Sequence, residues 1–138
     1  MKKTCGVLVI YGNKVMLCHP TNSSWTGTYG APKGMIDPDE AEIDCAVREI
    51  AEETSIIVDK SKLDPNPIII DYVNKTTVTK QLFLYVLRIK DLSEIGLASE
   101  VVPKEQLQLH EIDWCGFLTK EEAADKIFHR QKSILDMI

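Results

Sequence analysis

The chain has 138 residues, of which 44% are hydrophobic and 27% are charged, as in an ordinary globular protein. No apolar run approaches the roughly 18 residues that a membrane-spanning helix needs, which argues against a membrane partner. The formal net charge of −5, without a compensating basic cluster, argues against a nucleic-acid backbone as the main partner. With no repeat, linker or low-complexity tract, we expect one domain over residues 1–138.

The N-terminal apolar run, Val7–Ile10, is ended by Tyr11-Gly12-Asn13, and no small-residue cleavage site follows. We therefore expect strands over 4–10 and 14–19, joined by a turn at Gly12-Asn13, in a cytoplasmic protein. Residues 20–33 are rich in Pro, Asn, Ser and Gly, and this composition predicts a loop.

A helix is predicted next, from Pro38 or Glu40 to Thr54, because apolar residues recur there at three- and four-residue spacing. Its start is ambiguous: Asp37-Pro38 could cap the helix, or it could form a turn before it. The rest of the chain predicts three further strands, over 68–73, 80–90 and 111–117. Thr119 and Glu122 form a capping box for a final helix running towards Ile138. The order indicates an α/β fold, a mixed sheet with helices on both faces.

The four cysteines are widely spaced, form no C-x-x-C pair and have apolar neighbours: Cys5, Cys18, Cys45 and Cys115. This pattern is typical of buried free thiols in a reducing compartment, and it argues against a zinc site or a disulfide framework.

The predicted helix is unusually acidic, since residues 37–53 contain eight carboxylates and one basic residue, Arg48. Glu49, Glu52 and Glu53 stand at i, i+3 and i+4, where helical side chains are neighbours and like charges repel. A hard divalent cation such as Mg²⁺ or Mn²⁺ would turn that repulsion into attraction. Arg48 could reach Glu52 or Glu40 and fix a ligand's orientation. The E-x-x-E-E pattern alone, however, is more typical of a solvated acidic helix face.

The wider segment decides between these interpretations. Gly34, Glu40 and the run Arg48-Glu49-Ile50-Ala51-Glu52-Glu53-Thr54-Ser55-Ile56 stand at the spacing G-x5-E-x7-R-E-U-x-E-E-x-G-U, where U is bulky and aliphatic. This segment resembles the Nudix box at every defining position except Ser55, where the family has glycine. The resemblance implies an α/β/α sandwich over the whole chain. It also implies hydrolysis of nucleoside diphosphate derivatives by attack of water on phosphorus.

The resemblance further implies residue roles. Glu49, Glu52 and Glu53, with the backbone carbonyl of Lys33, would bind Mg²⁺ or Mn²⁺. Arg48 would orient the carboxylates, while Glu40 would support the loop before the helix. A box glutamate or one in a later loop would act as general base. For the later loop Glu111 is the first candidate, and Glu105 and Glu100 remain open.

Ser55 departs from the family pattern at the end of the helix. Glycine adopts the left-handed conformation freely, whereas serine pays about 1 kcal/mol there, unless the helix ends differently. The position is structural, so we expect it to affect local geometry rather than catalysis.

Substrate choice is less defined. The sequence Pro32-Lys33-Gly34 is similar to that of Nudix enzymes acting on dinucleoside polyphosphates, so Lys33 could meet a distal phosphate or be an exposed loop lysine. Tyr72 matches a tyrosine of diadenosine-polyphosphate and diphosphoinositol-phosphate enzymes, although packing on a strand is favoured. Trp25 and Tyr29 could stack on a base or anchor the loop. The facing of the basic residues Lys75, Lys80 and Arg88 is undetermined.

The leading hypothesis is a magnesium-dependent hydrolase whose favoured substrates are dinucleoside polyphosphates. The alternatives within the same chemistry are ADP-ribose, other nucleotide sugars, nucleoside triphosphates and a 5′-phosphorylated RNA end. A non-catalytic nucleotide sensor is the alternative of a different class, but here every box glutamate and the arginine are present. The partner is a small nucleotide, and the chain could be a monomer or a homodimer.

Overall fold

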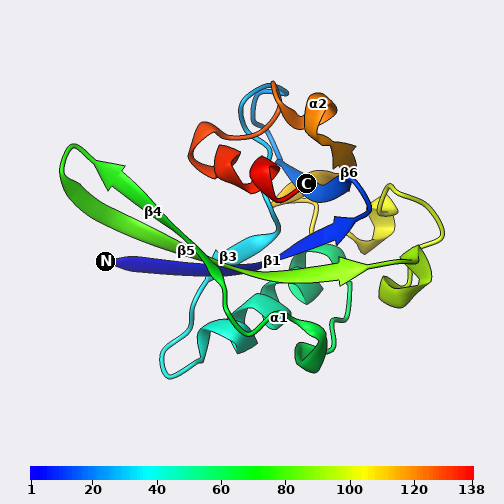
Figure 1. Ribbon diagram of the computed structural model, residues 1–138, viewed down its shortest axis with the longest axis horizontal. Helices are drawn as coiled ribbons and strands as arrows, with labels where there is room; N and C mark the ends of the chain where they lie inside the picture. The colour runs from blue at the N-terminus through cyan, green and yellow to red at the C-terminus, as the bar shows by residue number, and fades with distance from the viewer.

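The computed structural model describes residues 1–138 and contains one six-stranded mixed sheet (Figure 1). Five strands follow the order β4-β5-β1-β2-β6, and the sixth, β3, pairs with β1 outside this order. The strands are β1 (Lys2–Tyr11), β2 (Lys14–Pro20), β3 (Lys33–Met35), β4 (Ile68–Asn74), β5 (Thr77–Ile89) and β6 (Ile112–Thr119). β1 and β5 are parallel, while the other pairs are antiparallel. The predicted strands are therefore present, with ends shifted by a few residues.

The sheet is covered on both faces, because its central strands alternate between two apolar clusters. In β1, Cys5, Val7 and Val9 join the cluster under helix α1 (Glu42–Thr54), whereas Leu8 and Ile10 join the cluster under the C-terminal segment. Figure 1 shows α1 on one side of the sheet and α2 (Lys120–Ala123) with the C-terminus on the other. The α/β/α sandwich expected from the sequence is confirmed.

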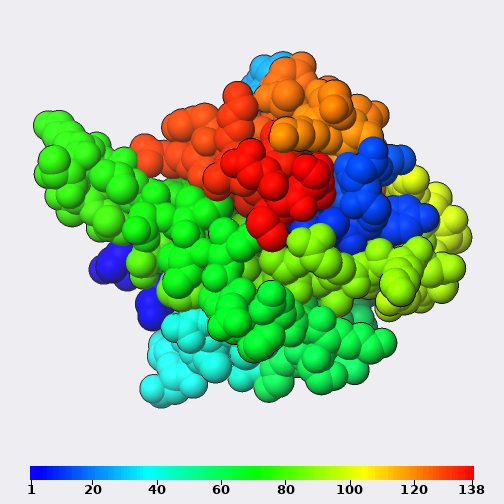
Figure 2. Space-filling model, in the orientation of Figure 1, coloured from blue at the N-terminus to red at the C-terminus, as the bar shows by residue number.

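The connections between these elements contain short 3-10 helices: η1 (Lys60–Lys62), η2 (Leu92–Ile95), η3 (Lys104–Gln106) and η4 (His129–Met137). The β4–β5 hairpin projects from the body of the molecule beside the N-terminal end of β1 (Figures 1 and 2). No helix has the length and apolar character needed to cross a membrane.

The segment before α1 differs from the prediction in two ways. Residues 33–35, assigned to or beside the loop, form β3, which pairs with β1 from Thr4 to Gly6. The helix begins at Glu42, later than both predicted starts. Asp39 has φ 64°, a left-handed conformation that no α-helix accommodates, so Asp37–Glu40 forms a turn. That turn is closed by Glu40, whose side chain accepts a hydrogen bond from the backbone of Asp37 at 3.0 Å.

The prediction of one final helix is wrong. The Thr119–Glu122 capping box is present, but α2 ends at Ala123, and residues 129–137 are 3-10 helix. Between them the backbone bonds to the loop after β2: Phe128 donates to the Tyr29 carbonyl at 2.8 Å, and Tyr29 donates to Lys126 at 2.9 Å. These long-range hydrogen bonds replace helical ones. The segment still covers the core as expected, since Ala123, Ile127, Ile134 and Leu135 are buried.

All four cysteines are buried and free, as expected. Cys18 and Cys115 face each other across β2 and β6 with their sulfur atoms 3.1 Å apart. Neither the spacing nor the composition indicated this pair, because the partners are in strands far apart in the sequence.

Candidate active site

The site is built where β3 passes in front of α1. Gly34 lies so close to the helix that a Cβ atom added there would be 2.0 Å from Oε2 of Glu49. Only glycine leaves room for that carboxylate, because a contact under 3.0 Å forces either the strand or the glutamate to move. The first position of the motif is therefore explained by packing against its metal-ligand candidate.

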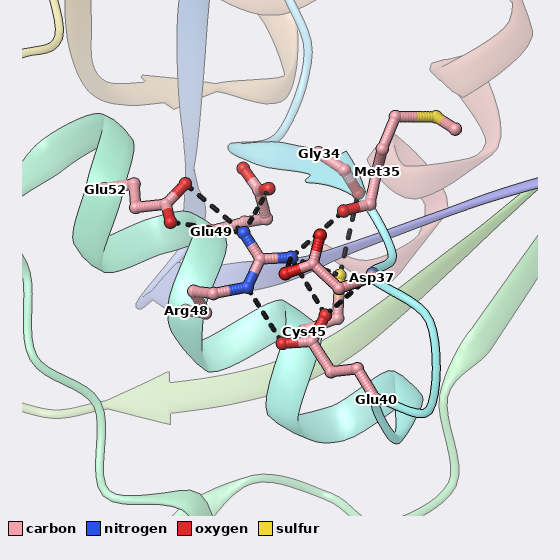
Figure 3. Close-up of polar contacts among 8 residues, drawn as sticks. All are labelled: Gly34, Met35, Asp37, Glu40, Cys45, Arg48, Glu49 and Glu52. Atoms are coloured by element: carbon pink, nitrogen blue, oxygen red, sulfur yellow. Dashed lines mark hydrogen bonds and ion pairs between the residues drawn. The ribbon is translucent and has the colours of Figure 1, made fainter.

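Arg48 joins the turn, the strand and the helix through one guanidinium (Figure 3). Its Nε and Nη2 donate to the two carboxylate oxygens of Glu40 at 2.8 and 2.9 Å, and Nη2 also donates to the Met35 carbonyl at 3.0 Å. Its Nη1 donates to Glu49 at 2.9 Å and to Glu52 at 3.2 Å. Both contacts considered for Arg48 from the sequence, with Glu40 and with Glu52, are thus made.

The bidentate contact with Arg48 holds the pKa of Glu40 at about 2, well below its usual value of 4.5. The surrounding carboxylates raise the pKa of Arg48 above its ordinary value, with the hydrogen bond to Glu40 as the largest cause. Both groups are therefore charged at neutral pH, and the clamp is a permanent part of the loop-to-helix geometry.

The three glutamates of the R-E-x-x-E-E core lie in different environments. Glu49 and Glu53 are buried, whereas the side chain of Glu52 is 48% exposed. Burial raises the pKa of Glu49, against the lowering effect of Arg48. Burial also raises the pKa of Glu53 to about 8, with Lys33 opposing the shift and Glu49 and Glu111 adding to it. Two buried carboxylates beside a third make a position that favours a cation.

No three acidic, histidine or cysteine side chains are close enough together to form a ready-made metal site. The donor chemistry nevertheless fits a hard divalent metal, since the helix offers carboxylate oxygens at i, i+3 and i+4 and buries two of them. Residues that could hold the metal are Glu49, Glu52 and Glu53. Lys33, on β3 and lining the same cavity as Glu53, could add its backbone carbonyl.

A cavity of about 190 Å³ opens beside the buried end of this carboxylate face. Its lining contains two acidic side chains, Glu53 and Glu111, and two basic ones, Lys33 and Lys80. Of the three late-loop base candidates, only Glu111 lines the cavity; Glu100 is paired with Lys14 at 2.6 Å, and Glu105 is exposed on η3. A cavity lined by both kinds of charge can accept a metal ion together with phosphate oxygens.

Tyr72 also lines this cavity, and its position is set by a residue that sequence reasoning missed, Gln131. The buried Gln131 amide donates to the Tyr72 hydroxyl at 3.1 Å and accepts from the backbone of Ala31 at 3.0 Å. Gln131 is separated from both partners by more than fifty residues, so no local pattern could have indicated the contact. Tyr72 therefore both packs in the core and lines the cavity.

Trp25 and Tyr29 are placed differently from Tyr72, because neither lines the cavity. The Trp25 ring, 55% exposed, stacks on the buried His19 with centroids 3.5 Å apart, and Tyr29 is buried against His19 and Trp114. His19 is fixed by Asp113 and by the Ser24 carbonyl. Both aromatic residues therefore anchor the loop between β2 and β3. Arg88 lies elsewhere, beside Val86 and Met137.

Comparison with known proteins gives one family. The NUDIX domain model matches residues 2–136. The mRNA decapping complex subunit 2 of Schizosaccharomyces pombe is 30% identical over 86 residues, which are 62% of this chain. The chain spans only 10% of the length of that relative.

Two solved structures illustrate the shared fold. An Ap4A hydrolase of C. elegans, in a binary complex, has a TM-score of 0.68 and 21% identity, covering 99% of this chain and 93% of its own. The MutT NUDIX hydrolase of Burkholderia pseudomallei has a TM-score of 0.74 and 15% identity, covering 99% and 97%. With the acidic helix, the Arg48 clamp and the match over nearly its whole length, the chain belongs to the Nudix hydrolase family.

Proposed function

We propose that this chain is a divalent-metal-dependent hydrolase of phosphoanhydride bonds whose substrates are dinucleoside polyphosphates of the diadenosine type. The observation that supports the proposal most is the mixed charge of the cavity lining, which contains the acidic side chains of Glu53 and Glu111 and the basic side chains of Lys33 and Lys80. A substrate with several linked phosphates matches this arrangement, because it needs a cation at the scissile bond and positive charge further along the chain.

In the proposed mechanism, the metal is Mg²⁺ or Mn²⁺ on Glu49, Glu52, Glu53 and the Lys33 carbonyl. When bound, it supplies charge neutralisation at phosphorus and lowers the pKa of a water molecule. Arg48 orients the carboxylates of Glu49 and Glu52 through hydrogen bonds of 2.9 and 3.2 Å. No covalent nucleophile is required.

The remaining roles belong to residues lining the cavity. The exposed Glu111 side chain lines the cavity, 3.9 Å from Nε2 of His110, and its carboxylate would take the proton of the attacking water. The Lys33 and Lys80 ammonium groups would contact phosphate oxygens beyond the scissile bond. Tyr72 forms a wall beside Lys80, whose Nζ lies 5.0 Å from the centre of the ring. Residues 1–138 would act as one catalytic domain, in which Trp25 and Tyr29 anchor the loop between β2 and β3.

A second candidate substrate is the 5′ end of an RNA, favoured by the similarity to an mRNA decapping complex subunit over 86 residues. The chemistry at phosphorus would be the same. The net charge of −5 argues for contact with the RNA end rather than with a long stretch of its backbone.

One assay separates these substrates. The wild type is incubated with Mg²⁺ and a panel of diadenosine polyphosphates, ADP-ribose, nucleotide sugars, nucleoside triphosphates and 5′-capped RNA, beside Glu52→Gln, Glu53→Gln and the exposed control Glu121→Gln. We expect diadenosine polyphosphates to be cleaved fastest, with kcat lowered roughly 100-fold or more in the two site variants, as is usual for lost acid–base or metal-binding groups. Glu121→Gln should match the wild type.

Faster cleavage of another substrate would overturn the choice of substrate alone. Full activity in both site variants, or no cleavage of any substrate by the wild type, would overturn the catalytic proposal.

A further inference from the structure

A second, more open cavity of about 500 Å³ adjoins the one described above and shares Tyr72 and Lys80 with it. Its lining contains three basic side chains and no acidic one: Lys2, Tyr72, Asn74, Thr79, Lys80 and Arg130. In a chain with a net charge of −5, a cavity with only positive charge is unexpected. Because the two cavities meet at Tyr72 and Lys80, one ligand could extend from the first into the second.

The strand register places two of the cations next to each other. Lys2 of β1 is directly opposite Lys80 of β5, and Lys80 is directly opposite Tyr72 of β4. Side chains that are opposite each other on neighbouring strands point to the same face, and like charges in that arrangement are destabilising. Figure 1 shows the N-terminal end of β1 beside the hairpin in agreement with this register. An anion between Lys2 and Lys80 would remove the repulsion.

Arg130 brings a third positive charge to the same place from η4. Its Nη1 donates to the Val73 carbonyl at 2.9 Å, and its guanidinium carbon lies 5.7 Å from the Tyr72 ring. The Tyr72 ring is thus approached by both Lys80 and Arg130. Because the hydrogen bond to Val73 uses only one nitrogen, the other guanidinium donors remain free for a ligand.

None of these three cations forms an ion pair, whereas Lys3, Lys14, Lys60 and Arg48 all do. Burial lowers the pKa of Lys80, and the charges of Lys33 and Lys2 lower it further. The protein therefore keeps several positive charges close together without a counter-charge of its own. Phosphate groups are the ligands that such a cluster of lysine and arginine side chains recognises.

We propose that the cavity lined by Lys2, Lys80 and Arg130 is a second anion subsite, which binds a phosphate of the substrate beyond those held near the carboxylates of α1. The ligand is a condensed phosphate chain long enough to pass Tyr72. The inference rests on the proposed function only in assigning that chain to the enzyme's own substrate. Its consequence is a preference for substrates with longer phosphate chains.

The subsite is tested first by binding alone. Inorganic tripolyphosphate is titrated by calorimetry without divalent metal into the wild type, Lys2→Gln, Arg130→Gln and the control Lys132→Gln, an exposed neighbour on η4 that lines neither cavity. We expect the Kd to rise roughly threefold to tenfold in the first two variants, as for a lost charge-assisted contact, and not in the control. Unchanged Kd values in both site variants would overturn the subsite. Lys2→Gln keeps the test decisive if Arg130→Gln affects folding, since Lys2 is exposed at the end of β1.

A kinetic comparison separates this inference from the proposed function. With diadenosine tri-, tetra- and pentaphosphate, Arg130→Gln should raise KM for the longer substrates and leave kcat unchanged. If no diadenosine polyphosphate is cleaved, the proposed substrate fails, while tripolyphosphate binding still decides the subsite. If Arg130→Gln leaves the ratio of the KM values for the longer and shorter substrates unchanged, the subsite fails while the proposed function stands.

Discussion

Gly34 is a position at which the site has no room for a side chain. Its missing side chain leaves the space that the Glu49 carboxylate occupies, and that carboxylate is then held by Arg48. The glycine is thus needed because of a close contact, since its φ is not in the left-handed region. The sequence motif identifies Gly34, but it does not show that the glycine makes room for the Glu49 carboxylate.

Gly34→Ala should therefore impair catalysis more than folding. The added methyl group would displace the Glu49 carboxylate from its place, so we expect kcat/KM to fall by roughly tenfold or more, about 1.4 kcal/mol in transition-state stabilisation. Steady-state kinetics with Mg²⁺ measures the effect, with Met35→Ala, a half-exposed neighbour on β3, as the control. Wild-type activity in Gly34→Ala would show that Glu49 needs no fixed position.

Ser55 ends α1 in the left-handed conformation that the family glycine would adopt, with φ 63° and ψ 12°. The first of the two expected outcomes is thus observed, a strained serine rather than a different helix end. The serine also gains a contact that glycine lacks, because its hydroxyl donates to the Gln106 carbonyl at 2.7 Å.

Two substitutions separate strain from hydrogen bonding at Ser55. Ser55→Ala keeps the strain and loses the hydrogen bond, so it should lower the free energy of unfolding by about 0.5–1.5 kcal/mol. Ser55→Gly loses the same bond but relieves about 1 kcal/mol of strain, so it should stay close to the wild type. Urea denaturation measures both. A more stable Ser55→Ala would contradict this explanation.

At the scale of elements, α1 and the turn before it form one unit. The helix buries Cys45, Ala46 and Ile50 against the sheet and presents its carboxylates on another side. Arg48 ties the helix to the turn through Glu40 and to β3 through the Met35 carbonyl. Helix packing fixes the direction of the acidic face, and the Arg48 clamp fixes the loop in front of it.

The Glu40–Arg48 clamp predicts a pH-dependent contribution to stability. The pKa of Glu40 is lowered to about 2, chiefly by Arg48, so its stabilisation is complete above the unfolded value of 4.5 and is lost as the pH falls towards 2. Glu40→Gln should lower the free energy of unfolding at pH 7 by about 1–2 kcal/mol, allowing for solvent screening.

Guanidinium denaturation at several pH values measures this contribution. The difference between wild type and Glu40→Gln should be constant from pH 7 to about 5 and become smaller below pH 4.5. The matched control is Asp39→Asn, one residue away and exposed at the turn. A difference that grows as the pH falls would mean that the clamp does not depend on an ionised Glu40.

The elements that the sequence predicted well are those with long, regular patterns. The strands and the acidic helix have apolar residues at periods of two or three to four, and packing in the sheet agrees with those periods. β3 was missed because three residues are too short to show a period. The final helix was wrong because backbone bonds between Tyr29, Lys126 and Phe128, nearly a hundred residues apart, replace helical bonds there.

In the site, too, residues with a local sequence pattern could be predicted and residues placed by long-range contacts could not. Glu49, Glu52, Glu53 and Arg48 were predictable because their spacing on one helix is local, and their roles as metal ligands and orienting residue stay predictions. Gln131 was not predictable, since its contacts with Ala31 and Tyr72 exist only in the folded chain. The place of Tyr72 and Lys80 in the lining of both cavities was equally hidden, because their pairing depends on strand register rather than on sequence spacing.

At the scale of the whole molecule, the acidic helix face and the two adjoining cavities differ in the sign of their charged side chains. The acidic face of α1 is followed by a cavity with both charges and then by a cavity with only basic charge. Sheet order explains this arrangement, because β1 is hydrogen-bonded to β3 near the acidic face and to β5 near the basic cavity. A metal at one end and phosphate groups along the rest would balance both excesses of charge.

The central claim is that the acidic face of α1 binds the catalytic metal. Mn²⁺ binding, measured by electron paramagnetic resonance of the free ion, tests it most directly in the wild type, Glu52→Gln, Glu53→Gln and the control Glu121→Gln. We predict a site in the wild type and the control, weakened by roughly tenfold or more in the two site variants, as expected when a ligand carboxylate loses its charge. Equal Mn²⁺ affinity in all four proteins would contradict the account.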